Sequence, residues 1–209
     1  MLSLKQNRGF TLIEMAVVLV IIGLILGAAM KGKDLIQGAK QKQFYNNYVK
    51  NWQLAVLNYY DRTGMVLADG TSNGGSQATT DGRFDNVSGA NFGNANGVDN
   101  ALQKVGLTVP ESNTAASGQY TFQGRYSGPR TITLYLYYLR SHTDGTYHNS
   151  LYFVGIPTDL AIAIDKVHDG TVGANKGRFR RYPDNADGGT WPDASTTPVV
   201  NAMLQMDIP

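Results

Sequence analysis

The sequence predicts an α+β protein in which a long N-terminal helix packs against a small antiparallel sheet. Three observations lead to this fold class. Residues 10–31 form an apolar run, residues 32–63 carry apolar side chains every three or four positions, and residues 119–156 contain segments that alternate with period two. We therefore expect one helix with a transmembrane half and an amphipathic half, followed by a globular head at 64–209.

The apolar run has the length of a membrane-spanning helix. About 20 residues at 1.5 Å each match the roughly 30 Å hydrocarbon core of a bilayer. A secretory signal peptide would have a shorter apolar region followed at once by small residues at a cleavage site. Between residues 10 and 30 the only ionisable side chain is Glu14. A carboxylate costs a few kcal/mol in hydrocarbon, so a simple membrane anchor leaves Glu14 unexplained.

The residues around Glu14 carry a family resemblance. A short basic leader ends in Gly9, and Phe-Thr-Leu-Ile-Glu and the apolar run follow it. This arrangement resembles the class III leader of type IV pilins and of type II secretion pseudopilins. The resemblance is specific over residues 1–35 and implies a pilin fold for the rest. It also implies that a prepilin peptidase removes residues 1–9 between Gly9 and Phe10 and methylates the new amino terminus of Phe10.

Glu14 has a physical role if the chain is cut there. A buried amine and a buried carboxylate each cost less when they are paired. Within one helix the Phe10 amine and Glu14 are poorly placed to meet, whereas staggered helices in a filament can bring them together. We therefore predict that Glu14 fixes the axial register of assembly, as a buried polar residue does in a coiled coil. The alternative is a side chain that reaches the membrane interface.

Small residues in the same segment suit helix packing. Gly23 and Gly27 form a Gly-x-x-x-Gly pair, a spacing that lets apolar helices approach closely. Random apolar sequences also produce this pair often.

The second half of the helix is predicted to end at Gly64, a common left-handed stop. Gly32 and Gly38 weaken its first turns, and no proline occurs there, so any loosening falls on these glycines. The predicted apolar stripe consists of Leu35, Ala39, Lys42, Tyr45, Val49, Trp52, Val56 and Tyr59 or Tyr60.

Residues 64–98 are rich in Gly, Asn, Ser, Thr and Asp with few apolar positions. Two interpretations stay open, a disordered segment and an ordered surface loop with one short element. After it, residues 99–105 are predicted to form a short helix with Asp99 as N-cap and Gly106 as its stop.

The head is predicted to contain an antiparallel meander. Segments 119–126, 130–140 and 150–156 are rich in β-branched and aromatic residues, and a turn is expected at 127–129. In the second segment, Ile132, Leu134, Leu136 and Tyr138 alternate with Thr133, Tyr135 and Tyr137. One face should pack on the helix, and the other should be half-exposed and rich in tyrosine.

The C-terminal part is predicted to contain a short helix at 157–170 with Leu160, Ala163 or Ile164, and Val167 on one face. Residues 175–183 should form an edge strand whose basic side chains protect it from further pairing. The remainder is expected to be mostly loop, with residues 199–206 docking back.

Composition excludes several classes of function. The chain has no cysteine, which removes disulfides and thiolate zinc sites. Lys5 and Arg8 account for the formal charge of +2, so the chain without its leader is balanced and nothing favours nucleic-acid binding. No nucleophile motif and no phosphate-binding loop is present, so we do not expect an enzyme. For His142, His148 and His168, surface positions are a better interpretation than a metal site.

A calcium site is the one cofactor that the sequence raises. Asp184, Asp187 and Asp193 lie among Asn and Gly residues, but they lack the spacing and the terminal Glu of an EF-hand. The resemblance adds weight, because some pseudopilins bind calcium in a C-terminal loop. We favour a solvated loop and expect no cofactor.

The resemblance implies a structural subunit of a helical filament. Its expected partners are copies of itself, the prepilin peptidase, an inner-membrane assembly platform and, before assembly, membrane lipid. The subunit should wait in the bacterial cytoplasmic (inner) membrane with its head outside the cytoplasm, then enter a filament at the cell surface or in the periplasm. Lys5 and Arg8 fit a cytoplasmic leader, although Lys31 and Lys33 weaken the charge argument.

Three alternatives stay open at this point. A type IV pilus subunit and a type II secretion pseudopilin share the same N-terminal segment, and a monomeric membrane-anchored binding module is the rival from another class. Adhesion, motility, DNA uptake and secretion use indistinguishable helices.

Overall fold

The computed structural model describes residues 11–208, except for the side chain of Asp187. Contacts divide the chain into two units, Met1–Ala39 and Lys40–Pro209, and each is described by itself. The predicted cleavage site between Gly9 and Phe10 lies outside the described residues.

Helical structure extends from Leu12 to Thr63. Helix α1 (Leu12–Phe44) passes through Gly32 and Gly38 without a break. A π-helical turn (Tyr45–Val49) joins it to α2 (Lys50–Thr63). Gly64 adopts a left-handed conformation with φ 67°, and its N–H donates to the carbonyl of Tyr60 at 2.7 Å. The predicted length and stop are confirmed, and the irregularity in this helix is a π-bulge that the sequence did not indicate.

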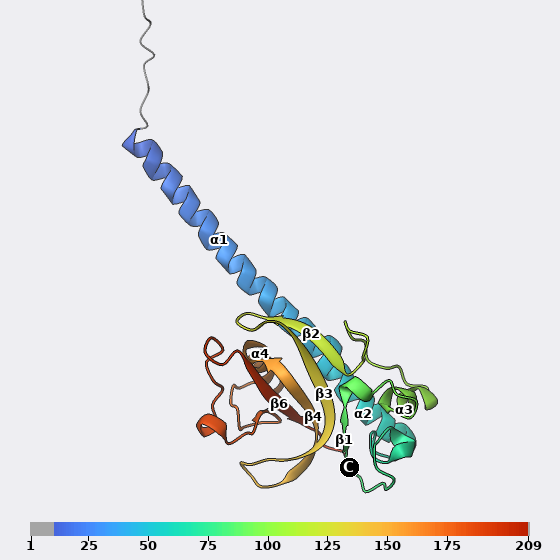
Figure 1. Ribbon diagram of the computed structural model, residues 1–209. Coiled ribbons are helices and arrows are strands. Elements are labelled where there is room, and N and C mark those ends of the chain that lie inside the picture. The colour runs from blue at the N-terminus through green and yellow to red at the C-terminus, as the bar shows by residue number, and fades with distance from the viewer. Residues whose placement is uncertain (1–10, 209) are drawn as a thin grey trace, which may run out of the picture. The chain divides into compact units, whose positions relative to one another are not determined.

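One antiparallel sheet of six strands occupies the described part of the head (Figure 1). Its strand order is β1-β3-β4-β6-β5, and β2 pairs with the same long strand β3 as β1 does. The α+β fold class is therefore confirmed. The strands are β1 (Asp85–Ser88), β2 (Gln119–Gly124), β3 (Gly128–Arg140), β4 (Tyr147–Pro157), β5 (Phe179–Tyr182) and β6 (Val199–Gln205).

Strand β3 shows the predicted alternation over most of its length. Ile132, Leu134 and Leu136 are buried, and the alternating residues Thr133, Tyr135 and Tyr137 are half-buried. The pattern then changes, because Leu139 is buried where Tyr138 was expected. The predicted turn was wrong by two residues: Gly128 pairs with Gly124, so the loop between β2 and β3 is 125–127.

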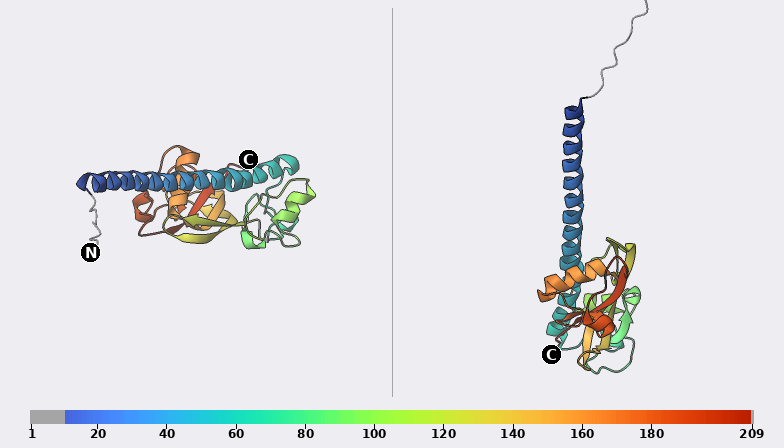
Figure 2. Two further views of the ribbon diagram at one scale, coloured as in Figure 1. Left: turned by 90° about the horizontal axis from the view of Figure 1, so that it is seen from above. Right: turned by 90° about the vertical axis from the view of Figure 1, so that its left-hand side faces the viewer.

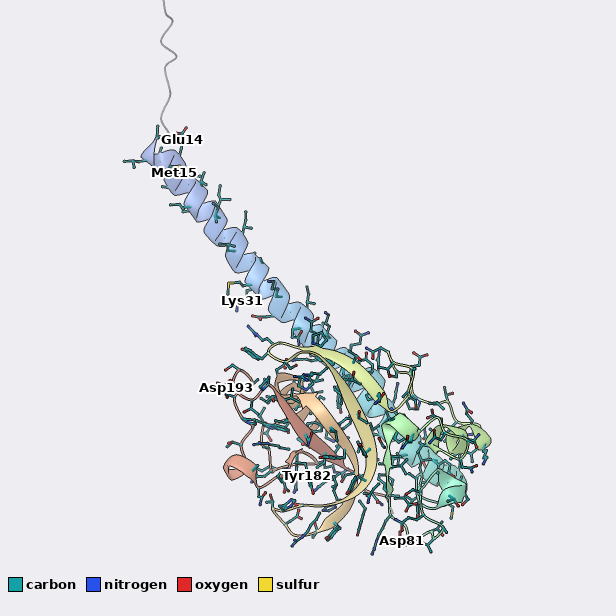
Figure 3. All side chains as sticks on the ribbon, viewed as in Figure 1. Glu14, Met15, Lys31, Asp81, Tyr182 and Asp193 are labelled. Atoms are coloured by element: carbon teal, nitrogen blue, oxygen red, sulfur yellow. The ribbon has the colours of Figure 1, made fainter. Side chains whose placement is uncertain are left out.

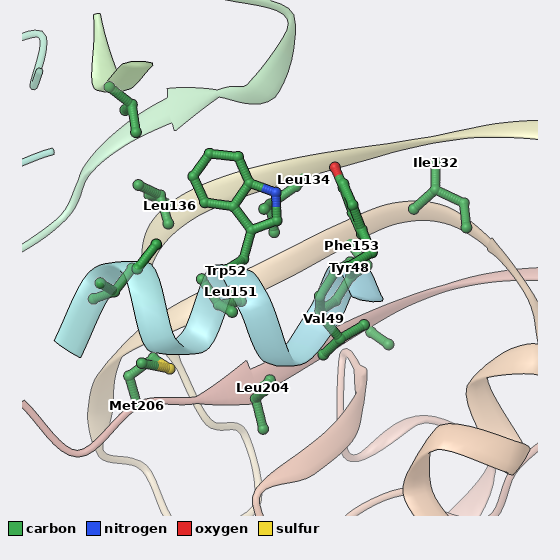
Figure 4. Packing of buried hydrophobic residues seen from close by; sticks show 14 of the residues in the cluster. Tyr48, Val49, Trp52, Ile132, Leu134, Leu136, Leu151, Phe153, Leu204 and Met206 are labelled. Carbon is green, nitrogen blue, oxygen red and sulfur yellow. The ribbon is translucent and has the colours of Figure 1, made fainter. Parts of the chain in front are cut away.

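Helix α2 covers one face of the sheet (Figures 1 and 2). Trp52 and Tyr48 are fully buried, and they point from the helix toward the inward side chains of the sheet (Figure 4). Aromatic side chains carry the largest buried areas in a core, so this face holds much of the packing energy of the head. The side chains around them include Ile132, Leu134, Leu136, Leu151, Phe153, Leu204 and Met206.

The glycine-rich segment after α2 is part of this core. Leu67, Phe84 and Phe92 are each at most 2% exposed, and β1 pairs with β3. These contacts support the ordered-loop interpretation over disorder. Two short 3₁₀ turns (Thr71–Asn73 and Gly89–Asn91) complete the segment.

The short helix after this loop is α3 (Val98–Lys104), and its N-cap is Gly97. The prediction of Asp99 as the cap was wrong. Asp99 lies in the first turn, where its carboxylate accepts the hydroxyl hydrogen of Ser117 at 2.7 Å.

The C-terminal part completes the sheet. Helix α4 (Thr158–Asp169) buries Leu160 and Ile164 as predicted, but Val167 is 46% exposed, which contradicts its predicted inward position. Strand β5 is the predicted edge strand. Residues 199–205 dock back as predicted, and they do so as strand β6, which lies between β4 and β5 in the interior of the sheet. A 3₁₀ turn (Ala186–Gly189) lies between β5 and β6.

Candidate assembly site in the first turn of helix α1

Glu14 lies in the first turn of α1 (Figure 3), where it forms a capping box with Thr11. The Glu14 carboxylate oxygen Oε2 accepts the backbone N–H of Thr11 at 2.8 Å and its hydroxyl hydrogen at 2.8 Å. The backbone N–H of Glu14 donates to the Thr11 hydroxyl at 3.2 Å. Two backbone N–H groups that have no partner in a bare helix end are thereby satisfied.

This capping leaves part of the carboxylate available. Glu14 is exposed, and all its side-chain hydrogen bonds to described residues use Oε2. The other oxygen, Oε1, has no partner among the described residues. One oxygen can therefore hold the helix end while the other accepts a cationic group from another molecule.

The rest of the first unit presents an apolar surface. Among the described residues, the Leu12–Thr63 helix is the one that is long and apolar enough to cross a membrane, and none of its most apolar window is buried. At Gly23 and Gly27 an added Cβ would meet no atom within 4 Å. Both glycines are thus open to a partner helix, and their predicted packing role stays a prediction.

Thr11 is a site residue that the sequence analysis missed. Its signal was present, because Thr-x-x-Glu before an apolar run is the signature of a capping box. Glu14 was interpreted only as half of an intermolecular ion pair, and the local hydrogen bonds were overlooked.

Asp184 and Asp193, the two calcium candidates with described side chains, belong to no group of metal-ligating side chains among the described residues. Asp184 is fully buried and accepts the Ser141 hydroxyl and the His142 N–H, each at 2.7 Å. Burial alone would raise the pKa of Asp184, but these hydrogen bonds outweigh it and hold the pKa below its usual value. The Arg180 guanidinium lies 3.4 Å away.

Asp193 (Figure 3) serves a local turn instead. It accepts the backbone N–H and the hydroxyl of Ser195, each at 2.7 Å, and these bonds lower its pKa. The side chain of Asp187 lies outside the described residues. Among the residues that are described, no three His, Cys, Asp or Glu side chains are grouped to hold a metal ion.

Asp165 on α4 is a fully buried acid. Its Oδ2 accepts the indole N–H of Trp191 at 2.6 Å and the N–H of Gly173 at 2.8 Å. Its Oδ1 is buried without a hydrogen-bond partner among the described residues. Burial, with a smaller contribution from the neighbouring Asp169 carboxylate, raises the pKa of Asp165 to about 6 although the two hydrogen bonds lower it.

The fold and the first turn of α1 define a class of protein. An exposed apolar helix precedes an α+β head, and residues 4–30 match the family model described as the prokaryotic N-terminal methylation motif. The resemblance to type IV pilins and pseudopilins is therefore confirmed.

A curated relative agrees with this class. The fimbrial protein EcpC of Eikenella corrodens is 29% identical to the chain over 130 residues, which cover 57% of this chain and 84% of the relative. No solved structure matches the chain significantly. The motif and the fimbrial relative together support a structural subunit of pilus or pseudopilus type.

Proposed function

We propose that the chain is a type IV pilus subunit that assembles by bundling its N-terminal helices, with Glu14 of one subunit paired to the Phe10 amine of a neighbour. The observation that carries the proposal is Glu14 itself, the single ionisable side chain of the apolar run at residues 10–30 and part of the matched methylation motif. The fimbrial relative favours a pilus over a secretion pseudopilus. The pseudopilin remains the second candidate because its N-terminal segment is the same.

The driving force is apolar. Side chains such as Leu19 and Leu24 are 66% and 70% exposed and would be covered by neighbouring helices in a bundle. Apolar burial has no preferred axial position, so it cannot set the register by itself. A pair of opposite charges in low dielectric is costly to break, which makes the paired register the favoured one.

The capping box lowers the entropy cost of this pairing. Since Oε2 is already held by Thr11, the carboxylate of Glu14 has a defined position before a neighbour arrives. A preorganised acceptor loses less conformational entropy on binding a cation. We further propose that a prepilin peptidase processes the chain, that the chain inserts in the inner membrane, and that an assembly platform builds the filament there. An enzymatic activity and a bound cofactor are not part of it.

Three substitutions separate charge from capping. Glu14→Ala removes both functions, Glu14→Gln keeps an acceptor for Thr11 without the charge, and Thr11→Ala keeps the charge without the side-chain cap. We expect the Ala and Gln variants at position 14 to stay in the membrane fraction yet form no filaments. The Thr11 variant should form them. Sheared fibres would be quantified by electron microscopy and by the mass of their main protein.

The outcomes are distinguishable. Normal filament yield from Glu14→Gln would refute the charge pairing, and loss from Thr11→Ala alone would assign assembly to the cap. The mass of the N-terminal peptide must be measured for each variant, because a processing defect would also abolish filaments. A methylated Phe10 start excludes the monomeric anchor. An intact Met1 in the wild type would refute the filament proposal.

A further inference from the structure

The head contains a cavity of about 500 Å³ that is lined by residues of β1 and of the loops before and after it. Its walls come from three parts of the segment between α2 and α3, around Ser76, around Ser88 and at 91–97. None of the side chains that line it is ionisable. A ligand of this cavity would therefore be neutral, since no group is present to balance a charge.

The lining offers amide groups with unused hydrogen-bonding capacity. Asn91, Asn94 and Asn96 are among the lining residues, and their side chains make no hydrogen bond to the described residues. Each amide carries two donor hydrogens and an acceptor oxygen. Adjacent donors and acceptors of this kind match a molecule whose neighbouring hydroxyls both donate and accept.

The walls are fixed before any ligand arrives. The buried carboxylate of Asp85 accepts the N–H of Gly70 at 3.0 Å and of Gln77 at 2.8 Å, which holds the loop that precedes β1. A Cβ at Gly75 would lie 2.3 Å from the Asp85 carboxylate. Asn86 has a left-handed φ of 60°, and its side-chain oxygen accepts the N–H of Tyr138 at 3.2 Å. Such preorganisation lowers the entropy cost of binding.

We propose that this cavity binds a neutral saccharide, either a hexose or an N-acetylhexosamine. Its volume is within the range of small-ligand sites, roughly 300–1,000 Å³. At the ligand efficiency of ordinary small molecules, one sugar ring binds with a Kd of about 1–10 mM. A filament of the proposed kind would carry one such cavity per subunit, and this repetition would raise the avidity for a ligand with several sugars. The gain in avidity rests on the proposed filament.

The test uses the full chain in micelles of a zwitterionic detergent, because sugar-headed detergents would compete. Saturation-transfer difference NMR is recorded with glucose, galactose and N-acetylglucosamine, and with N-acetylneuraminic acid as the charged comparison. We expect transfer to at least one neutral sugar with a Kd in the millimolar range. We expect at least tenfold weaker binding to the acidic sugar.

A triple variant tests the lining. Asn91, Asn94 and Asn96 are not among the described residues with left-handed backbone, so alanine is compatible with each. The change of all three to alanine should weaken binding at least tenfold while the melting temperature stays that of the wild type. Asn46→Ala, an exposed amide outside the cavity, should leave binding unchanged.

Three results would overturn the proposal. They are no transfer to any neutral sugar, equal binding by the triple variant, and equal binding of the acidic sugar. Because the measurement uses dispersed subunits, its failure leaves filament assembly intact, and failure of assembly leaves the titration valid.

Discussion

Replacing Asp165 with asparagine should stabilise the head at neutral pH. The carboxyl group is fully buried, and only Oδ2 has partners among the described residues, Trp191 and Gly173. Asparagine keeps an acceptor for both donors. Its amide N–H₂ would occupy the position of the unpartnered Oδ1, near the Asp169 carboxylate that raises the pKa of Asp165. The substitution thus replaces a carboxylate that the Asp169 carboxylate repels with an amide that can donate a hydrogen bond.

The magnitude follows from the pKa. A rise from 3.8 to about 6 means that the native state binds more protons than the unfolded state between these values. The free energy of unfolding therefore falls as the pH rises from about 4 to 6. At about 1.4 kcal/mol per pKa unit the loss is at most about 3 kcal/mol, and nearby solvent reduces it. We expect Asp165→Asn to gain about 1–3 kcal/mol at pH 8 and nothing below pH 4.

Urea unfolding of the full chain in micelles, followed by circular dichroism from pH 4 to pH 8, measures this gain. Other acids contribute the opposite slope, since the pKa values of Asp184 and Asp193 are lowered. The difference between variant and wild type isolates Asp165. Asp61→Asn, an exposed acid on α2, is the matched control and should change little. A variant as stable as the wild type at pH 8, or a difference that does not depend on pH, would refute the reasoning.

Four further substitutions test the packing of the head by urea unfolding. Asp184→Ala should cost about 3 kcal/mol, because it leaves the Ser141 hydroxyl and the His142 N–H without their buried acceptor. Asp193→Ala should cost much less, because Asp193 is exposed. Equal costs would contradict the buried network. Trp52→Ala should cost about 3–5 kcal/mol through the cavity that it creates, and a smaller loss would mean that the core collapses around it. Gly64→Ala should cost about 1 kcal/mol, because φ 67° strains any residue with a Cβ, and a neutral result would show that the helix end adjusts.

The features that the sequence predicted best are local. The transmembrane half of the helix follows from an unbroken apolar run, and its stop follows from the conformational freedom of Gly64. The methylation motif is likewise contiguous in sequence. Strand β3 was predictable because alternation with period two depends only on neighbouring residues.

Tertiary structure decided the features that depend on distant residues. Strand β6 becomes an interior strand only because the edges of β4 and β5 are both available to it, and its own residues do not specify these partners. The buried state of Asp165 likewise depends on Trp191, which lies far along the chain. Burial and pairing are properties of the assembled core, whereas periodicity and capping belong to a single segment. For that reason the sequence alone determined the long N-terminal helix. The tertiary structure determined which side chains of the head are buried, paired or open to a ligand.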